Sequence, residues 1–511
     1  MHRLFLTLLF LGLFANVATA QKEFANLDLP MRNAEDLVTV ADSSGNVCVY
    51  VYQNGKLYFN LLSSGGEVVS SQEIPYRNNE VPEIMGNRIT EDEFIFYSRH
   101  TSGRREYVRP FAINKETGAF RFVQDIELPL GRGEYFVGGF GDSNHFYMLY
   151  SDKKSNLHLF RDSEYDPAHF DRQSFEAVMP RTRERYDRES SMVYVHPDLD
   201  QTVFTGHYRS KIYTRGDKIH MIFDGYYLKG ERNKVTTEIL TLDWNSGSSE
   251  YRKLPVIEQK GEPSFNSFLY NNTLFRVTLK KEEVGLTAYD FNTLQLVQEY
   301  KYGGNEEITI KATPVYQRGA KALFSSDSKT IEETSKVMKN LDNGIPAITV
   351  DALTDSTLQL TIGSYQPPRG SNQSRDMSRM VHTPDRYVRT SRGLYMIPGR
   401  WTPAYNISSF YLDSPYYSRY FYDPYRGGYG QPTGPGVSTY FRAVLDSKTL
   451  AKANIEKPTL LQDKVEAYEQ ELKSEPDYKT VYRYGNKLHY GYYDRKSKTF
   501  RILEFSQNSQ E

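Results

Sequence analysis

The sequence predicts an all-β fold that repeats one four-stranded unit, and three observations carry this prediction. With 41 Tyr and 28 Phe among 511 residues, the composition favours strands. Short runs of alternating apolar and polar residues are separated by turns rich in Gly, Asn and Ser. The units begin at intervals of roughly 45 to 65 residues, which is the period of propeller blades.

The first unit shows the pattern most clearly. Its strands are predicted at 37–41, 47–52, 56–62 and 68–74. Asn54-Gly55 lies between the second and third of them, and this dipeptide between alternating runs is a strong signal for a β-hairpin. The unit is therefore expected to form one antiparallel sheet.

Further units follow the same plan. A second has strands at 84–89, 93–99, 105–113 and 120–128; others begin near Tyr135 and Gln201, and a fifth covers 265–302. The chain ends in three strands, 480–484, 487–493 and 499–505, one fewer than the other units. We expect a strand from residues 24–41 to complete this last unit, because pairing the two ends of the chain removes an exposed sheet edge.

The periodicity is interrupted in the C-terminal third. A capping box and an apolar stripe predict a helix at 328–344, and Pro458 with an apolar face beyond it predicts another at 458–473. Strands are expected at 345–350, 357–364 and 437–445. Between them, residues 365–436 form an insertion rich in Tyr, Pro and Gly.

These features resemble an exported β-propeller of six or seven blades. The resemblance implies a single propeller domain over residues 21–505 and a tail at 506–511, and a twin β-sandwich is the alternative fold. Gly138-Gly139-Phe140-Gly141 lacks the strand-to-helix context of a phosphate loop, so we interpret it as a close-packed corner.

The N-terminus predicts export. Arg3, an apolar run from Leu4 to Val17 and the small residues before Gln21 are typical of a cleavable signal peptide at 1–20. This signal end is similar to that of exported proteins of the Bacteroidota type, which favours a periplasmic or extracellular location. No later segment has the roughly 20 apolar residues of a transmembrane helix. Cys48 has no second cysteine with which to form an intrachain disulfide.

Charge and motifs exclude several classes of function. The formal net charge is −1, and the chain has no polybasic segment, so nucleic acid is not expected as a partner. Asp166, His169 and Asp171, and likewise His196, Asp198 and Asp200, match no known metal pattern and are interpreted as loops. The sequence predicts no metal, no cofactor and no catalytic residue. It favours a non-catalytic protein over an enzyme and leaves the enzyme alternative open.

The strongest functional signal is aromatic. Eleven aromatic residues lie between Trp401 and Tyr429, among prolines and arginines. Tyr and Arg dominate binding hot spots, and rings and prolines lower the entropy lost on binding. The predicted binding residues are Trp401, Tyr405, Tyr411, Tyr416, Tyr417, Arg419, Tyr420, Tyr422, Tyr425, Arg426 and Tyr429. The alternative is that the segment folds back on the blades as a lid.

Two hypotheses follow from this pattern. The first is a non-catalytic, exported protein-interaction module that acts through the Tyr-rich insertion as an accessory subunit of an envelope or outer-membrane assembly, with protein export as one such assembly. The second is a carbohydrate-binding or glycoside-hydrolase-type propeller, in which two carboxylates would flank a glycosidic bond in a central pocket. No spacing in the sequence selects such a pair.

Overall fold

The structure is a computed structural model of the 511-residue chain. It describes residues 21–506 except for gaps at 30, 32–35, 54–55, 76–82, 103–104, 142–143, 153, 155, 177–191, 196–202, 229–230, 259–263, 305, 319–327, 332–333, 367–379, 383–385, 391–392, 398–400, 404–436, 454–460, 473–476 and 486.

The fold is almost entirely β, as the sequence predicts, and its sheets follow one another along the chain. Most sheets are antiparallel meanders in which successive strands pair with their neighbours. The first three sheets are β2 (Asp36–Ala41), β3 (Val47–Gln53), β4 (Lys56–Leu62) and β5 (Val68–Pro75); β6 (Glu83–Ile89), β7 (Glu93–Ser102), β8 (Arg105–Asn114), β9 (Phe120–Phe122) and β10 (Ile126–Glu127); and β11 (Tyr135–Gly141), β12 (Phe146–Ser151), β13 (Leu157–Asp162) and β14 (Phe170–Phe175).

Two further sheets continue the series. They are β15 (Met192–Tyr194), β16 (Ser210–Arg215), β17 (Lys218–Leu228), β18 (Glu231–Asp243), β19 (Ser248–Lys253) and β20 (Ile257–Glu258); and β21 (Phe265–Tyr270), β22 (Thr273–Lys280), β23 (Glu283–Asp290) and β24 (Leu296–Gly303). The short helix α2 (Val203–Gly206) precedes β16. The single strand predicted at 120–128 is divided into β9 and β10. Val123 N–H still donates to the carbonyl of Pro110 on β8, but Pro110 has no N–H to donate in return, and the register is shifted by one residue where Ile126 pairs with Val108.

The terminal sheet joins the two ends of the chain. β1 (Gln21–Leu27) pairs antiparallel with β36 (Thr499–Phe505), which is followed by β35 (Lys487–Asp494) and β34 (Asp477–Tyr484). An N-terminal strand thus completes the three C-terminal strands. It begins at Gln21, before the expected range of 24–41, and shares only residues 24–27 with that range. Asp36–Ala41 instead opens the next sheet as β2.

The remaining large sheet carries the insertion. Its order is β26 (Ser328–Ile331), β25 (Val315–Arg318), β33 (Val437–Asp446), β28 (Thr357–Gln366) and β27 (Ile345–Thr354). The helix predicted at 328–344 is shorter, α3 (Thr334–Asp342), because Ser328–Ile331 pairs with β25. The helix predicted at 458–473 corresponds to α4 (Leu461–Glu471).

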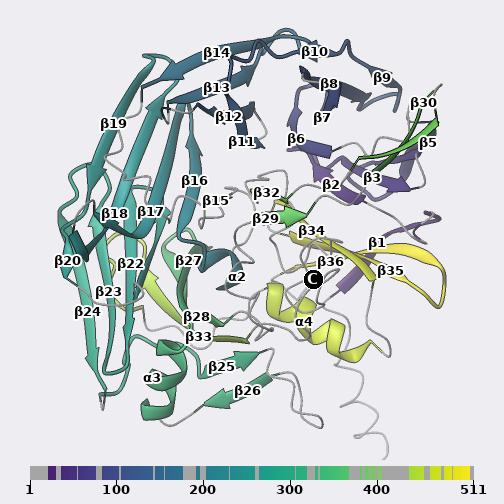
Figure 1. The fold of residues 1–511 in the computed structure, drawn as a ribbon. Coiled ribbons are helices and arrows are strands. Elements are labelled where there is room, and N and C mark those ends of the chain that lie inside the picture. The colour runs from purple at the N-terminus through teal and green to yellow at the C-terminus, as the bar shows by residue number, and fades with distance from the viewer. Residues whose placement is uncertain are drawn as a thin grey trace, which may run out of the picture.

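The sheets follow one another round the molecule in chain order (Figure 1). Hydrophobic clusters join neighbouring sheets. Val49 and Ile502 link the terminal and β2–β5 sheets, Tyr50 and Phe96 link the next pair, and the other clusters continue to the β25–β33 sheet. This is a β-propeller. Among the described residues no cluster joins the β25–β33 sheet to the terminal sheet, so the blade count of six or seven stays a prediction.

One turn recurs in five sheets. An Asp or Asn accepts hydrogen bonds at its side chain from residues that follow it, and its carbonyl accepts one from the fifth residue, which lies in the left-handed region. The five turns begin at Asn114, Asp243, Asp290, Asp446 and Asp494. A Ser or Thr always occupies the fourth position, so the repeat is also visible in the sequence.

No helix in the described part of the chain is long and apolar enough to cross a membrane.

Candidate functional site

The insertion is rooted in a complete β-hairpin. β28 and β33 pair without a register shift from Thr357 and Asp446 to Gln366 and Val437. The insertion therefore takes the place of the turn of this hairpin and starts at residue 367, two residues later than the sequence predicted. Both ends of the insertion lie in paired neighbouring strands, so the insertion does not interrupt the pairing of β28 with β33.

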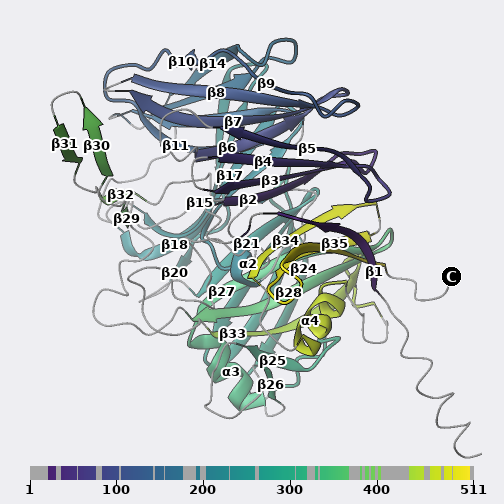
Figure 2. The ribbon, with the colours of Figure 1, turned by 90° about the vertical axis from the view of Figure 1, so that its right-hand side faces the viewer.

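Two small hairpins of the insertion lie to one side of the propeller. These hairpins are β29 (Met380–His382) with β32 (Trp401–Pro403), and β30 (Arg386–Thr390) with β31 (Gly393–Ile397). Figure 2 shows them beyond the ends of the large sheets, on the side that faces the viewer in Figure 1. We call this side the insertion face.

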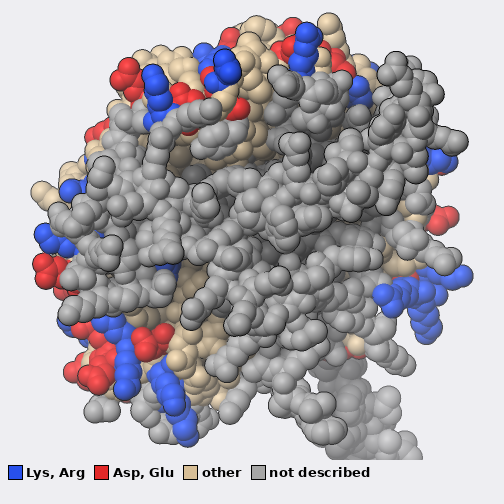
Figure 3. All heavy atoms as spheres, in the orientation of Figure 1, with Lys and Arg blue, Asp and Glu red and all other residues tan. Residues whose placement is uncertain are grey.

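The predicted binding residues fall almost wholly outside the described residues. The backbone of Trp401 pairs with His382 in the β29–β32 hairpin. The other ten predicted residues, from Tyr405 to Tyr429, lie outside the described ranges, so binding by this set stays a prediction. Lys, Arg, Asp and Glu are interspersed where Figure 3 colours the insertion face, in keeping with the net charge of −1.

A buried lysine lies under the base of the insertion. Lys211 on β16 is 1% exposed and donates to Asn266 Oδ1 on β21 at 2.6 Å and to the carbonyl of Tyr208. Asn266 Nδ2 donates to the carbonyl of Pro346, at the start of β27, at 2.8 Å. These bonds tie the inner strands of three sheets together. Burial lowers the pKa of Lys211 to about 8, while Asp224 opposes this shift.

Asp224 is the negative charge of this cluster. It is 1% exposed, and its carboxylate accepts hydrogen bonds from Thr237 Oγ1 at 2.6 Å, Ser267 N at 2.8 Å and Ser267 Oγ at 2.7 Å. These donors compensate for lost hydration, as a buried carboxylate requires. Asn266 Nδ2 also donates to the carbonyl of His207, and the ring of His207 lies 4.6 Å from that of the buried Tyr365 near the end of β28. The cluster therefore fixes the hairpin from which the insertion starts.

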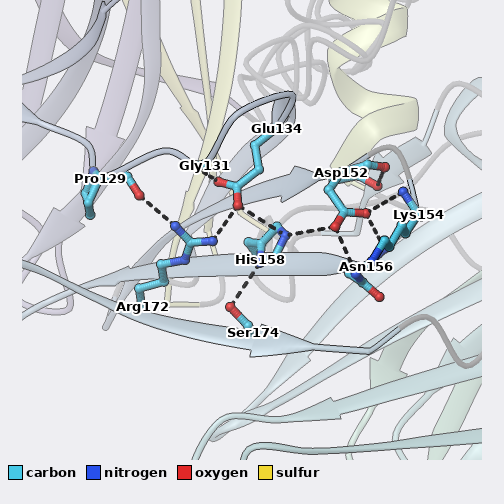
Figure 4. A network of polar contacts seen from close by, with 10 residues as sticks. Pro129, Gly131, Glu134, Asp152, Lys154, Asn156, His158, Arg172 and Ser174 are labelled. Atoms are coloured by element: carbon cyan, nitrogen blue, oxygen red, sulfur yellow. Dashed lines mark hydrogen bonds and ion pairs between the residues drawn. The ribbon is translucent and has the colours of Figure 1, made fainter.

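A second polar network surrounds His158 (Figure 4). Its Nδ1 lies 2.9 Å from Ser174 Oγ, and its Nε2 lies 3.3 Å from Glu134 Oε1 and 3.8 Å from Asp152 Oδ2. Glu134 also accepts from Arg172 at 2.6 Å and from the backbone N–H of Gly131 at 2.8 Å. The network thus joins the connector that precedes β11 to the β12–β13 turn and to β14.

This network lies on the insertion face. In the sheet of β11–β14, the inner strand is β11, and the β12–β13 turn joins the second and third strands. In the sheet that carries the insertion, the inner strand is β27, and the insertion likewise joins the second and third strands, β28 and β33. Inner strands of successive propeller blades run in the same direction, so both connections emerge on the same side. The Ser, His and Glu side chains resemble a nucleophile, base and orienting acid, but Arg172 already pairs with the acid.

The metal patterns set aside in the sequence stay without support. His169 Nε2 is 3.2 Å from Asp171 Oδ1 on an exposed turn. His196, Asp198 and Asp200 fall outside the described residues. Nowhere among the described residues do three His, Cys, Asp or Glu side chains gather in a way that could hold a metal ion. Gly139 and Gly141 lie in β11, where a Cβ on Gly141 would be 2.8 Å from the carbonyl oxygen of Asn87, as a close-packed corner requires.

Sequence reasoning did not single out either cluster. Lys211 and Asp224 occupy inward positions of strands whose other inward residues are apolar, such as Ile222. A charged residue in such a position was the available signal, because charges are seldom buried without partners. Its partners on β21 and β27 are distant in the sequence, so the network itself required the structure.

Comparisons with known proteins do not assign the chain to a family. No protein-family model matches the chain, and no curated protein matches it. Among solved structures, it is similar to the β-propeller domain of the Trilobed protease from Pyrococcus furiosus, with 9% identity over 65% of this chain and 79% of that chain and a TM-score of 0.29.

Two further structures are similar to the same degree. The WD40 domain of SCAP from fission yeast has 10% identity over 64% of this chain and 82% of that chain, with a TM-score of 0.28. The uncharacterized protein lmo1340 from Listeria monocytogenes has 13% identity over 55% and 70%, with a TM-score of 0.29. At these TM-scores the similarities carry no argument, and the fold assignment rests on the sheets themselves.

Proposed function

We propose that the chain is a non-catalytic, exported β-propeller that binds a protein partner through its Tyr-rich insertion. The partner would be a component of a cell-envelope or outer-membrane assembly, in which the propeller is an accessory subunit; protein export is one such assembly. Propellers present loops from a rigid ring, and binding residues are disproportionately found on loops held by rigid scaffolds.

The observation that carries the proposal is the position of the insertion. Seventy residues, 367–436, replace the turn between two strands that remain paired up to Gln366, the last residue of β28, and Val437, the first residue of β33. An elaboration of this length is typical of a functional loop. The aromatic and arginine content of 401–429 adds the residue types of binding hot spots.

We also propose the arrangement and compartment that this role requires. The described residues contain seven sheets of four or more strands, which would be seven blades of one ring. β1 begins at Gln21, directly after the predicted signal peptide at 1–20. Removal of that segment would leave the pairing of β1 with β36 intact, which is compatible with export to the periplasm or beyond.

A deletion tests the proposal. Residues 367–436 are replaced by Asn-Gly, a dipeptide that closes two-residue hairpins, so that β28 and β33 can still pair. Affinity purification of the tagged wild type from solubilised envelopes should recover a partner in stoichiometric amount. The deletion variant should lose it while keeping the circular dichroism and thermal midpoint of the wild type.

A matched variant separates composition from mere length. It keeps the full length of the insertion and replaces five of its tyrosines with Ser: Tyr416, Tyr417, Tyr420, Tyr422 and Tyr425. Loss of the partner in both variants supports binding through the aromatic segment. Retention of the partner in both, or recovery of no partner by the wild type, contradicts the proposal.

The carbohydrate alternative has no specific observation in its favour among the described residues. It would require a pair of carboxylates in an open central pocket, and we do not propose it.

A further inference from the structure

One histidine lies at the centre of the sheet that joins the ends of the chain. His489 on β35 is 1% exposed and pairs in register with Tyr482 on β34 and Glu504 on β36. Its ring is stacked on that of Tyr482, with centroids 4.7 Å apart and an interplanar angle of 1°. The ring of Phe24 on β1 meets it edge-on at 4.8 Å. This side chain therefore contacts the other three strands of the sheet.

The contact with β1 occurs at an irregularity of the strand. The register between β1 and β36 shifts between Glu23 and Ala25, so Phe24 is the bulged residue. The neighbouring β4–β5 turn covers it from the other side: Gly66 has φ +85°, and a Cβ on Gly66 would overlap the carbonyl oxygen of Phe24. β1 is thus held at Phe24 by His489 and by the Gly66 turn, in addition to its pairing with β36.

The imidazole is poorly placed to carry a charge. Neither Nδ1 nor Nε2 has a hydrogen-bond partner in the structure, and both atoms are shielded from solvent. Glu504 Oε2 lies 3.6 Å from Nε2, but the other oxygen of this carboxylate is bound by Lys487 Nζ at 2.9 Å. Lys22 on β1 lies opposite Glu504 in the register, which adds a second cation.

We propose that His489 is an acid-sensitive latch, and that protonation of its imidazole releases β1 from the terminal sheet. An imidazolium needs acceptors for two N–H groups, and here these are reached only if the ring leaves its place between Tyr482 and Phe24. Attraction of the cation to the two rings and to Glu504 opposes release. β1 is the strand that yields, because it is an edge strand paired with β36, whereas β34 at the other edge also contacts β2 of the neighbouring sheet.

The sign of the pH dependence follows from the direction of the pKa shift. Burial is the largest cause and lowers the pKa of His489 to about 4, with Lys487 acting in the same direction and Glu504 in the opposite one. The released state, with its ordinary pKa near 6.5, takes up a proton first as the pH falls. The attachment of β1 to the terminal sheet is therefore most stable above about pH 6.5, and this stability is lost progressively as the pH falls toward 4.

Pulsed hydrogen–deuterium exchange, corrected for intrinsic rates, tests the latch in the whole chain. In the wild type, protection of the amides of residues 21–27 should fall by about tenfold between pH 7.5 and pH 5.5. Protection of residues 47–62, in the centre of the adjacent sheet, should change little. His489→Phe keeps an apolar ring that cannot be protonated, so its β1 amides should stay protected at pH 5.5.

Two control variants fix the interpretation. Gly66→Ala should expose residues 21–27 at pH 7.5, because its methyl group displaces Phe24 without any proton. His169→Gln, at an exposed site, should behave as the wild type. If wild-type β1 keeps its protection at pH 5.5, or loses it together with residues 47–62, the proposal is wrong. Equal loss in the wild type and His489→Phe also overturns it, and if His489→Phe does not fold, the wild-type comparison alone decides.

Discussion

At the scale of single residues, the recurring turn shows how a short pattern is reused. Its fifth residue has a positive φ in every copy, and this residue is Gly118, Gly247, Leu294, Leu450 or Lys498. Glycine adopts this conformation freely, whereas other L-residues do so at a cost. The last three copies therefore carry local strain that the surrounding hydrogen bonds hold in place.

Relief of this strain gives the first prediction. Lys498 is exposed and has φ +61°, so Lys498→Gly should raise the free energy of unfolding by about 0.5 to 1 kcal/mol. Lys496→Gly, two residues earlier in the same turn and without a positive φ, is the control and should not stabilise. Urea denaturation measures both, and an equal effect of the two substitutions would contradict the strain account.

Lys211 gives a prediction about pH. Its folded pKa of about 8 lies below the ordinary value of 10.5, so between these values the unfolded chain binds a proton that the folded chain lacks. The contribution of Lys211 to stability should thus improve as the pH rises from 8 to 10.5, by up to roughly 3 kcal/mol. The difference in unfolding free energy between wild type and Lys211→Met measures this, with Lys218→Met as the exposed control. A difference independent of pH would contradict the assigned direction.

At the scale of elements, the connectors are held by specific polar contacts as well as by packing. Glu134 is anchored by Arg172 and by the N–H of Gly131, and it faces His158 Nε2 at 3.3 Å. Its side chain is 7% exposed. The carboxylate thus fixes the connector before β11 against β13 and β14, close to the insertion face.

Removal of this carboxylate gives the third prediction. Glu134→Ala leaves Arg172 and His158 without their shared partner and should lower the free energy of unfolding by about 1 to 3 kcal/mol. Glu127→Ala, which removes an exposed ion pair with Arg105, should cost less than about 1 kcal/mol. Chemical denaturation of both variants checks the difference. Equal costs would mean that the network contributes no more than a surface pair.

The sequence was sufficient for the strands and insufficient for the polar clusters. Alternating runs between turns located β3, β4 and β33 to within a residue or two, because a half-buried strand leaves its period in the sequence. The helix predicted from residue 328 failed at its start, since pairing of Ser328–Ile331 with β25 overrode a local capping pattern. Contacts such as Lys211 with Asn266 depend on the packing of sheets and leave no local trace.

At the scale of the whole molecule, the two ends of the chain share one sheet, and each sheet from there to the β25–β33 sheet shares a hydrophobic cluster with the next. The insertion and the latch lie in different sheets of this ring. Deletion of 367–436 is therefore expected to leave the acid response of β1 unchanged. Hydrogen–deuterium exchange of residues 21–27 in the deletion variant, at pH 7.5 and pH 5.5, measures this response. A changed response would indicate coupling between the two regions.

The pairing of β1 with β36 is the central claim, and an engineered disulfide tests it most directly. Asn26 and Arg501 are partners in the register, and buried Cys48 is the one native cysteine. The double variant Asn26→Cys, Arg501→Cys should form a disulfide in mild oxidant, seen as a mass loss of about 2 Da, because partner residues meet the required geometry. Asn26→Cys with Lys496→Cys, outside the register, should not. Failure of the registered pair to form, or formation in the control alone, would contradict the closure of the propeller by its N-terminal strand.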